Sequence, residues 1–568
     1  MVEDGQPDKQ SLGRHILGSS AYLGRRDAML CQAAKRNVTQ HPLKNITLHE
    51  PAKADLLPYL DAEASGKPIS LRPFIPRCVE IIWSTANERI VHESIISLDA
   101  NAEVSRTGPK KGQHGSIDRY EAKSAVEKIV NHPEVRKAVK ALGLAENVTI
   151  ACDPWMYGAD RDNDEETHKF IQGYLVGFNY REGMTIHDVR YDGRPLFYRL
   201  SISEMTVPYG DPRTPYHRKQ AMDLGTIKYF SGWLNDENGM PVPAENVICM
   251  HEQDGGIGWK HTHRLTHHAS VVRARNLVLQ SIITVGNYEY IFAWVFMQNG
   301  NVDLEVQATG ILSTSLIDDG KTSDWGNVVS PGTLAANHQH LFSMRVDPMI
   351  DGSRNTVVQE DSVPIPQTED EDPHGNAWRV VKTPLETSGF SDADPFANRC
   401  FEIVNENIFS PISENPVGYK LVPQPRQLLL AGKDSVARKR AKFAEHHIWV
   451  TKYRDGDLWA AGKWTNQSLE ETDGLADYAG RADSVRNEDL VLWHTFGMTH
   501  NPRVEDFPVM PVEITTISLK PADFFSKNPA LDVPRSKQSE DRSVLYQDPL
   551  EAAVAEQTPC GDCDKAKL

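Results

Sequence analysis

Two pairs of histidines have a spacing that could bind a metal ion: His261 with His263, and His338 with His340. On a β-strand, side chains two residues apart point to the same face, so either pair would present two imidazoles together. The first pair stands in "WKHTHRLTHHA", rich in Thr and Arg, which we interpret as a loop. The second opens the alternating stretch "NHQHLFSMRVDPMIDG", which predicts a strand. For either pair, two solvent-exposed histidines are an equally good interpretation.

A third ligand must come from another part of the chain. The segment "VLWHTFGMTHNPRVEDFPVMP", far downstream, offers His494 and His500. Three neutral imidazoles with open coordination positions suit copper(II) or zinc. Calcium and magnesium prefer oxygen ligands, which Asp347, Asp351 and Asp489 would supply, although on spacing alone solvated turns are the better interpretation of these carboxylates.

The stretch "SIITVGNYEYIFAW", residues 281–294, has an unusual centre. Its flanks are rich in Ile, Val and aromatic residues, which predicts a buried strand. The middle nevertheless carries Asn287, Tyr288 and Glu289 in succession. A buried tyrosine most often packs and donates its hydroxyl to a neighbour. Composition alone therefore leaves the purpose of this triplet open.

The composition limits the class of protein. With 568 residues the chain is too long for one small core, so we expect several domains. The formal net charge is −17, with no sustained basic run, which argues against nucleic acid or an anionic membrane and favours a small ligand. No stretch is long and apolar enough for a membrane span, and the N-terminus lacks a secretory pattern. We expect an intracellular protein.

The pattern along the chain predicts an α+β protein with two small N-terminal α+β domains followed by a large antiparallel β-sandwich. Three turn dipeptides, Asp192-Gly193, Asn238-Gly239 and Asn299-Gly300, sit between alternating runs and indicate hairpins. The expected units are a poorly ordered arm at 1–45, small domains at 46–112 and 113–176, the sandwich at 177–530 and a tail at 531–568.

The last three residues, Ala566 to Leu568, read "AKL" and resemble the Ser-Lys-Leu address of peroxisomal proteins. We therefore expect a peroxisomal location, and otherwise a cytoplasmic one. Seven cysteines spread over the chain do not form a disulfide scaffold.

Taken together, the motifs resemble one family. "TVGNYEY" resembles the Thr-x-x-Asn-Tyr-(Asp/Glu) signature of the copper-containing amine oxidases. "HQHLFSMRVDPMIDG" and "HTFGMTHNPRVEDFPVMP" resemble the two copper-ligand segments of that family, in the same order. The resemblance runs from about Leu48 to about Pro529. It implies a homodimeric primary-amine oxidase that converts an amine, water and O₂ to an aldehyde, ammonia and hydrogen peroxide.

The resemblance also implies roles for individual residues. By carry-over, His338, His340 and His500 bind copper(II), and Tyr288, preceded by Asn287, is oxidised to topaquinone. A quinone offers the electrophilic carbonyl that a phenol lacks and can accept two electrons from an amine.

Further matches concern the substrate and a second metal. Asp223 in "AMDLG" matches the general base that removes the α-proton of the bound substrate, and Tyr209 in "VPYGDP" a tyrosine that orients the quinone. Ala221 matches the gate of the substrate channel, where its small side chain would leave the channel open. Asp347 and Asp489 match ligands of a peripheral site for calcium or another divalent ion. In that site Met349 stands where the family usually has a carboxylate.

Two departures shorten the family pattern. After Gly225 the sequence goes directly to "TIKYFSG", which removes the cysteine expected to pair with Cys249. A longer segment is missing between "HKFIQGYL" and "VGFNYREGM". We interpret the chain as a shortened form of the family or an imperfect gene model. The alternatives are a mononuclear metal oxygenase or hydrolase with an unmodified Tyr288, and a catalytically inactive relative.

Overall fold

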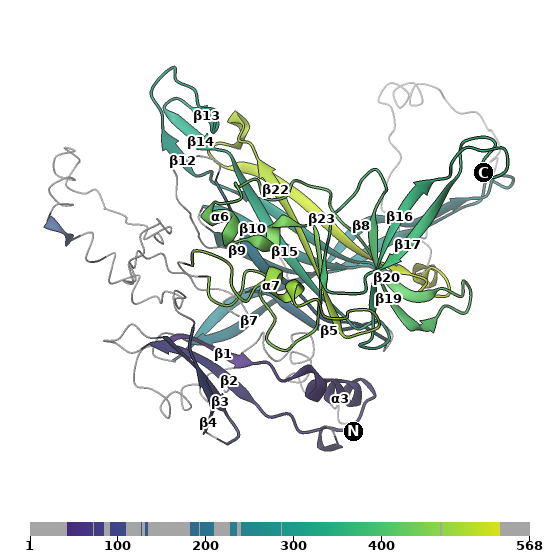
Figure 1. The fold of residues 1–568 in the computed structure, drawn as a ribbon, viewed down its shortest axis with the longest axis horizontal. Helices are drawn as coiled ribbons and strands as arrows, with labels where there is room; N and C mark the ends of the chain where they lie inside the picture. The colour runs from purple at the N-terminus through teal and green to yellow at the C-terminus, as the bar shows by residue number, and fades with distance from the viewer. Residues whose placement is uncertain are drawn as a thin grey trace, which may run out of the picture.

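The computed structural model describes residues 43–533, apart from 72, 85–90, 101, 110–126, 128–130, 134–181, 192–193, 210–227, 236–239, 286 and 466–467. Within these residues the protein is mostly antiparallel β-sheet (Figure 1). This confirms the large antiparallel unit that the hairpin pattern predicts. The second small domain expected at 113–176 lies almost entirely outside the described residues, so the two-domain N-terminal arrangement stays a prediction.

A four-stranded sheet with the order β1-β2-β3-β4 forms the N-terminal module. Its elements are β1 (Leu43–His49), α3 (Lys53–Ala64), the 3₁₀ turn η1 (Ile69–Leu71), β2 (Cys78–Ser84), β3 (Val91–Ser97) and β4 (Ala102–Thr107). Apolar side chains that alternate along the strands, such as Ile46, Val79 and Ile81, form its small core. In Figure 1 this purple module lies along the lower edge of the main sheets.

Ten strands make the larger sheet of the main body, in the order β17-β16-β19-β20-β23-β11-β10-β9-β8-β7. Their bounds are β7 (Lys228–Asn235), β8 (Pro241–Thr262), β9 (Ala269–Val285), β10 (Tyr288–Phe296), β11 (Val302–Gly310), β16 (Thr356–Pro364), β17 (Trp378–Pro384), β19 (Cys400–Phe409), β20 (Pro416–Val422) and β23 (Met510–Ala522).

Six strands make the second sheet, in the order β18-β21-β22-β15-β6-β5. Their bounds are β5 (Thr185–Tyr191), β6 (Arg194–Thr206), β15 (His338–Pro348), β18 (Gly389–Ser391), β21 (Ile448–Lys452) and β22 (Leu490–His500). A three-stranded sheet contains β12 (Thr314–Leu316), β13 (Gly326–Ser330) and β14 (Thr333–Ala336). The remaining short helices are α6 (Val436–Lys439), η2 (Lys442–Glu445), α7 (Leu475–Gly480), η3 (Val504–Asp506) and η4 (Pro529–Asp532).

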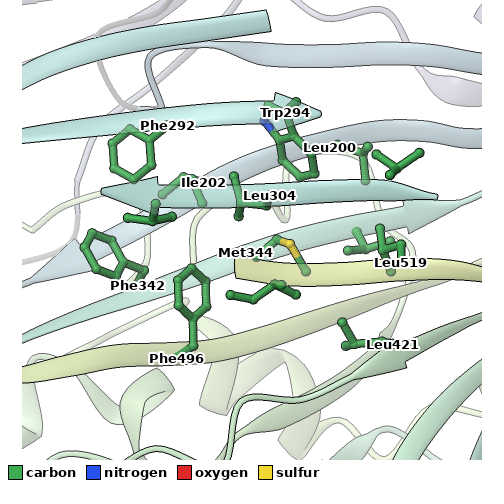
Figure 2. Close-up of a cluster of buried hydrophobic side chains, with 14 of the residues drawn as sticks. Leu200, Ile202, Phe292, Trp294, Leu304, Phe342, Met344, Leu421, Phe496 and Leu519 are labelled. Carbon is green, nitrogen blue, oxygen red and sulfur yellow. The ribbon is translucent and has the colours of Figure 1, made fainter. Parts of the chain in front are cut away.

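The main core lies between the ten-stranded and the six-stranded sheets. Figure 2 shows Phe292 and Trp294 of β10 on one side and Phe342 and Met344 of β15 on the other, all buried. These residues alternate along their strands with side chains that face the opposite way, as the period of two requires. The two sheets therefore form a sandwich, and their inner faces hold a continuous apolar interior.

The strands β15 and β22 are covered on both faces. Every residue of β15 is buried, and so is nearly every residue of β22. Phe342 on one face of β15 belongs to the main core, whereas Leu341 on the other belongs to a second apolar cluster with Phe443 and Trp449. Two buried faces hold this strand pair firmly, which suits it to position chemical groups.

The hairpin predictions agree with the observed pairing, because the strands on either side of each turn dipeptide, β5–β6, β7–β8 and β10–β11, are antiparallel partners. The interpretation of "WKHTHRLTHHA" as a loop is partly wrong. Strand β8 continues through His261 to Thr262, and only the following residues form the turn before β9. Antiparallel pairing with β9 across the hairpin extends a segment whose own composition favours a loop. In the described part of the chain, no helix is long and apolar enough to span a bilayer.

Candidate functional site

Two tyrosines of one sheet meet two histidines of the other sheet inside the sandwich. The Tyr288 hydroxyl lies 2.7 Å from Nε2 of His338, and the Tyr290 hydroxyl lies 2.6 Å from Nδ1 of His340. The tyrosines alternate along β10 and the histidines along β15, so each pair points into the core from its own sheet. All four residues are buried. The strand period thus builds two parallel tyrosine–histidine contacts across the sandwich.

The polar triplet at residues 287–289 has three different environments. Asn287 belongs to the turn between β9 and β10, and its carbonyl accepts a hydrogen bond of 2.7 Å from the N–H of Ile311. Tyr288 faces the core, whereas the Glu289 carboxylate accepts a hydrogen bond from Thr284, its cross-strand partner. The signature threonine and glutamate therefore close the hairpin on the face opposite to Tyr288.

A glycine on the neighbouring strand permits this arrangement. Gly310 pairs with Tyr288 across β11 and β10 and has a φ of +113°. A Cβ at this position would lie 2.4 Å from the Asn287 carbonyl oxygen and 2.8 Å from the Tyr288 Cα. Since both contacts are with backbone atoms, no side-chain rotation would relieve them. Gly310 lets β11 approach the tyrosine-bearing turn closely.

Three histidines from two strands converge beside Tyr288. Potential ligand atoms of His338, His340 and His500 lie within 4.8 Å of one another. The register of β15 with β22 places His338 directly opposite His500, and His340 follows two residues later on the same face. The structure therefore brings together the three histidines that the family resemblance selects.

Hydrogen bonds identify the ring nitrogen that each histidine leaves for a metal. The His338 Nδ1–H donates to the Ala336 carbonyl at 2.8 Å, so its Nε2 accepts the proton of Tyr288. Nε2 of His340 and Nδ1 of His500 are buried and have no hydrogen-bond partner. If Nε2 of His340 offers a lone pair, its Nδ1 carries the ring hydrogen and donates it to Tyr290.

A carboxylate orients the third histidine. The His500 Nε2–H donates to Asp506 Oδ2 at 3.1 Å. Asp506 also accepts from the Arg503 backbone and guanidinium, both at 2.8 Å. Although burial opposes it, these hydrogen bonds lower the pKa of Asp506 to about 2, so it is ionised. An ionised partner on Nε2 leaves the Nδ1 lone pair free to bind a metal.

Burial keeps the side chains of His338, His340 and Tyr288 neutral. It lowers the pKa of His338 to about 3, and that of His340 well below its ordinary value. Burial also raises the pKa of Tyr288 far above the usual range of a phenol, with smaller contributions from nearby acidic groups. The site therefore offers the neutral imidazoles of His338 and His340 beside a protonated phenol in a buried environment.

These residues fit a copper ion. The buried, unpartnered nitrogens of His340 and His500 are an unusual cost for a protein interior, and a metal ion would satisfy both. Imidazole nitrogens suit copper and zinc and are poor ligands for calcium or magnesium. Within the described residues this triplet is the group of three or more His, Cys, Asp or Glu side chains that could hold a metal.

Tyr209 contacts the site through a histidine. Its ring stacks on that of His338, with 4.9 Å between centroids and 20° between planes. An isolated β-bridge joins the two residues, and the neighbouring Pro208 carbonyl accepts from the Gln339 N–H at 3.0 Å. Burial raises the pKa of Tyr209 to about 12. Tyr209 thus supports one face of the His338 ring.

The other histidines that the sequence offered as metal ligands do not join this site. Both nitrogens of the buried His494 contact backbone groups, with the His447 carbonyl 2.9 Å from Nδ1 and the Gln424 N–H 3.4 Å from Nε2. His261 and His263 are exposed near the end of the β8–β9 hairpin. Asp223 and Ala221 fall outside the described residues.

The two carboxylates expected at a peripheral metal site do lie together, with a third group between them. The Lys53 ammonium donates to Asp347 Oδ1 and to Asp489 Oδ1, both at 2.7 Å. Asp351, the third carboxylate considered, instead pairs with Arg194. Cys249, whose expected partner is missing, is buried and free.

Sequence reasoning missed Tyr290, Asp506, Gly310 and Lys53. Tyr290 gave a signal, since it follows Tyr288 with the spacing of two that places both on one face of a strand. Asp506 stands in the same segment as His500 but is one of several nearby acidic residues. Nothing in the pattern around Lys53 indicates a contact with strands so distant in the chain.

Comparisons with known proteins agree with this geometry. The family model "Copper amine oxidase, enzyme domain" matches residues 173–540. Copper amine oxidase 1 of Aspergillus niger is 39% identical, over 90% of this chain and 96% of the relative. Peroxisomal primary amine oxidase of Pichia angusta is also 39% identical, over 63% of this chain and 57% of the relative.

A solved structure extends the likeness to the fold. The copper-containing benzylamine oxidase of Hansenula polymorpha superposes with a TM-score of 0.83 and 33% identity, covering 92% of this chain and 100% of that chain. The Aspergillus alignment spans 647 positions, more than the 568 residues of this chain. It therefore contains stretches of the relative without a counterpart here, in agreement with a shortened chain.

Proposed function

The chain belongs to the copper amine oxidase family, and on that premise we propose that Tyr288 and the three facing histidines form its catalytic centre. The activity is oxidative deamination of a primary amine by O₂, giving an aldehyde, ammonia and hydrogen peroxide. One observation carries the assignment. The buried Tyr288 hydroxyl lies 2.7 Å from a ring nitrogen of His338, within a triad of metal-ligating imidazoles.

Four residues of the chain would hold the metal or form the cofactor. When bound, copper and the topaquinone formed from Tyr288 supply an electrophilic carbonyl that takes two electrons from the amine and passes them to O₂. His338 and His340 would hold the metal through Nε2, and His500 would hold it through Nδ1. On His340 and His500 these lone pairs are unpartnered, whereas on His338 the metal would take the lone pair that accepts the Tyr288 proton.

Three further residues act on the substrate and the cofactor ring. Asp223 accepts the α-proton of the bound amine, a weak carbon acid whose deprotonation requires a carboxylate held close by. Tyr209, stacked on His338, restricts the position of the ring at residue 288. Ala221 leaves the channel beside that ring wide.

The experiment starts from protein purified without copper. Aerobic copper loading should give a coloured adduct with phenylhydrazine, and the peptide containing residue 288 should show the mass of a quinone. Tyr288→Phe is the matched control, which should bind copper and form no adduct. Asp223→Asn should form the adduct and lose turnover. An unaltered tyrosine at position 288 after loading would contradict the proposal.

Substrate, location and assembly are finer proposals. Benzylamine, named for the Hansenula enzyme, is the first substrate to test in a panel that also includes aliphatic monoamines and diamines. A peroxisomal location is supported by the name of the Pichia relative, and deleting Ala566–Leu568 from a fluorescent fusion would test it. A homodimer agrees with the exposed apolar side chains Trp378 and Val380 on β17 and is testable by native mass measurement.

A further inference from the structure

Lys53 stands in a cage that the N-terminal module and the sandwich build together. It is the first residue of α3, and its ammonium lies 2.7 Å from Asp347 Oδ1 and from Asp489 Oδ1. The ammonium also lies over the rings of Tyr198 and Tyr453, at 4.6 and 4.3 Å from their centroids. The side chain of Lys53 is only 3% exposed. A cation surrounded by two carboxylates and two ring faces is well stabilised away from water.

The backbone of Lys53 is tied to the same region. Its N–H donates to Asp455 Oδ1 at 3.1 Å, and the Tyr453 hydroxyl donates to that oxygen at 2.8 Å. A carboxylate that accepts from the first N–H groups of a helix also interacts favourably with the helix dipole. The loop after β21 therefore contacts both the Lys53 backbone, through Asp455, and the Lys53 ammonium, through the Tyr453 ring.

The charges in the cage balance without a metal. Asp347 is fully buried, and its second oxygen lies 3.3 Å from the Arg345 guanidinium, which is also buried. Two carboxylates thus face two protein cations, Lys53 and Arg345. A divalent ion added between Asp347 and Asp489 would meet the ammonium at short range, and such like-charge contacts are strongly unfavourable in a buried site.

The cage lies on the strand pair that also carries the histidines. Asp347 is near the end of β15 opposite to His338, and Asp489 immediately precedes β22, which ends at His500. The histidines face the main core, whereas Asp347 faces the other side of the six-stranded sheet, as the alternation along β15 requires. The cage therefore fastens the N-terminal module to the far end of the strands that hold the catalytic centre.

We propose that the Lys53 ammonium takes the place of a divalent cation between Asp347 and Asp489. In this protein the peripheral site is an internal ion pair that joins the N-terminal module to the sandwich, and copper is the metal that the chain requires. The proposal concerns stability and metal content and goes beyond the amine oxidation proposed above.

Calcium binding to the copper-free wild-type protein is the first measurement. Titration calorimetry should detect no calcium binding, and calcium should leave the melting temperature unchanged within about 1 °C, because a ligand that does not bind the native state cannot stabilise it. Stoichiometric calcium binding that Asp489→Asn abolishes would overturn the proposal, and this measurement needs no Lys53 variant to fold.

The second measurement removes the ammonium. Lys53→Met keeps the apolar stem and leaves Asp347 and Asp489 without their shared cation, so we expect the melting temperature to fall by roughly 5 °C. Added calcium should restore part of that loss, and the double variant Lys53→Met/Asp489→Asn should not respond to calcium. Loss of stability without any rescue by calcium would identify an ordinary ion pair and overturn the substitution of a metal.

Lys452→Met is the matched control. Lys452 pairs with Glu488 at 3.2 Å on the surface next to the cage, with both side chains more than a third exposed. Exposed ion pairs contribute little to stability, so this variant should melt within about 1 °C of wild type and remain indifferent to calcium. A loss in the control as large as that in Lys53→Met would show that burial of the Lys53 pair has no special effect.

Discussion

Replacing Gly310 by alanine tests whether the close approach of β11 controls the position of Tyr288. The added Cβ would lie 2.4 Å from the Asn287 carbonyl oxygen, whereas real Cβ contacts essentially never fall below 3.0 Å. The backbone at Gly310 and the backbone at Asn287 must therefore separate by at least 0.6 Å, the difference between these two distances. This shift exceeds the spread of roughly 0.5 Å that O–H hydrogen-bond distances normally show. It therefore threatens the 2.7 Å contact between Tyr288 and His338.

The substitution should lower both the stability of the fold and the rate of quinone formation. A φ of +113° is unfavourable for alanine, by about 1–3 kcal/mol, and separating backbone atoms inside a fully paired sheet adds to that. Misplacing a reacting group by about 1 Å can cost roughly a hundredfold in rate, so a shift of 0.6 Å should slow quinone formation by at least about tenfold. Copper affinity should change little, because the three histidines belong to the other sheet.

The assay loads copper-free protein aerobically and follows the phenylhydrazine titre with time, beside a copper titration and a thermal melt. Gly480→Ala is the control, since Gly480 closes α7 and a Cβ there would meet nothing within 4 Å. The reasoning is refuted if Gly310→Ala acquires its quinone as fast as wild type and Gly480→Ala do.

Three further predictions each concern a single buried residue. Tyr290→Phe removes the partner of His340 Nδ1 and should weaken copper binding by about 10–100-fold in an equilibrium titration, and unchanged affinity would show that this contact does not orient the ring. Burial raises the pKa of Glu471 to about 8, so the folded state retains a proton that the unfolded state releases above its ordinary value of 4.5. Stability that this proton provides at low pH is lost as pH rises towards 8, at up to about 1.4 kcal/mol per pH unit. Denaturant melts of wild type and Glu471→Gln should therefore diverge in favour of the variant with rising pH, and parallel curves would contradict the assignment. Phe342→Ala removes a fully buried ring between β15 and β10 and should cost about 3–5 kcal/mol in the free energy of unfolding, whereas a loss below about 1 kcal/mol would show that the core collapses around the gap.

Much of the local structure could be predicted from the sequence. The spacing of His338 and His340 predicts that both imidazoles share one face of a strand, and β15 has them so. Dipeptides such as Asn299-Gly300 predicted hairpins because few residue types accept the backbone angles of a tight turn. The family resemblance, confirmed by the comparisons, selected His500 over His494, a choice that spacing alone left open.

Contacts between distant strands were decided only by the tertiary structure. His500 meets His338 because of the register of β15 with β22, and the pairing of Tyr290 with His340 depends on how the two sheets face each other. Lys53 reaches Asp347, which lies 294 residues away in the chain, and neither residue shows a periodicity that points to the other. Strand periodicity is a local property that each segment carries by itself. Register and sheet packing instead arise from burying many apolar side chains at once, so no short stretch of sequence contains them.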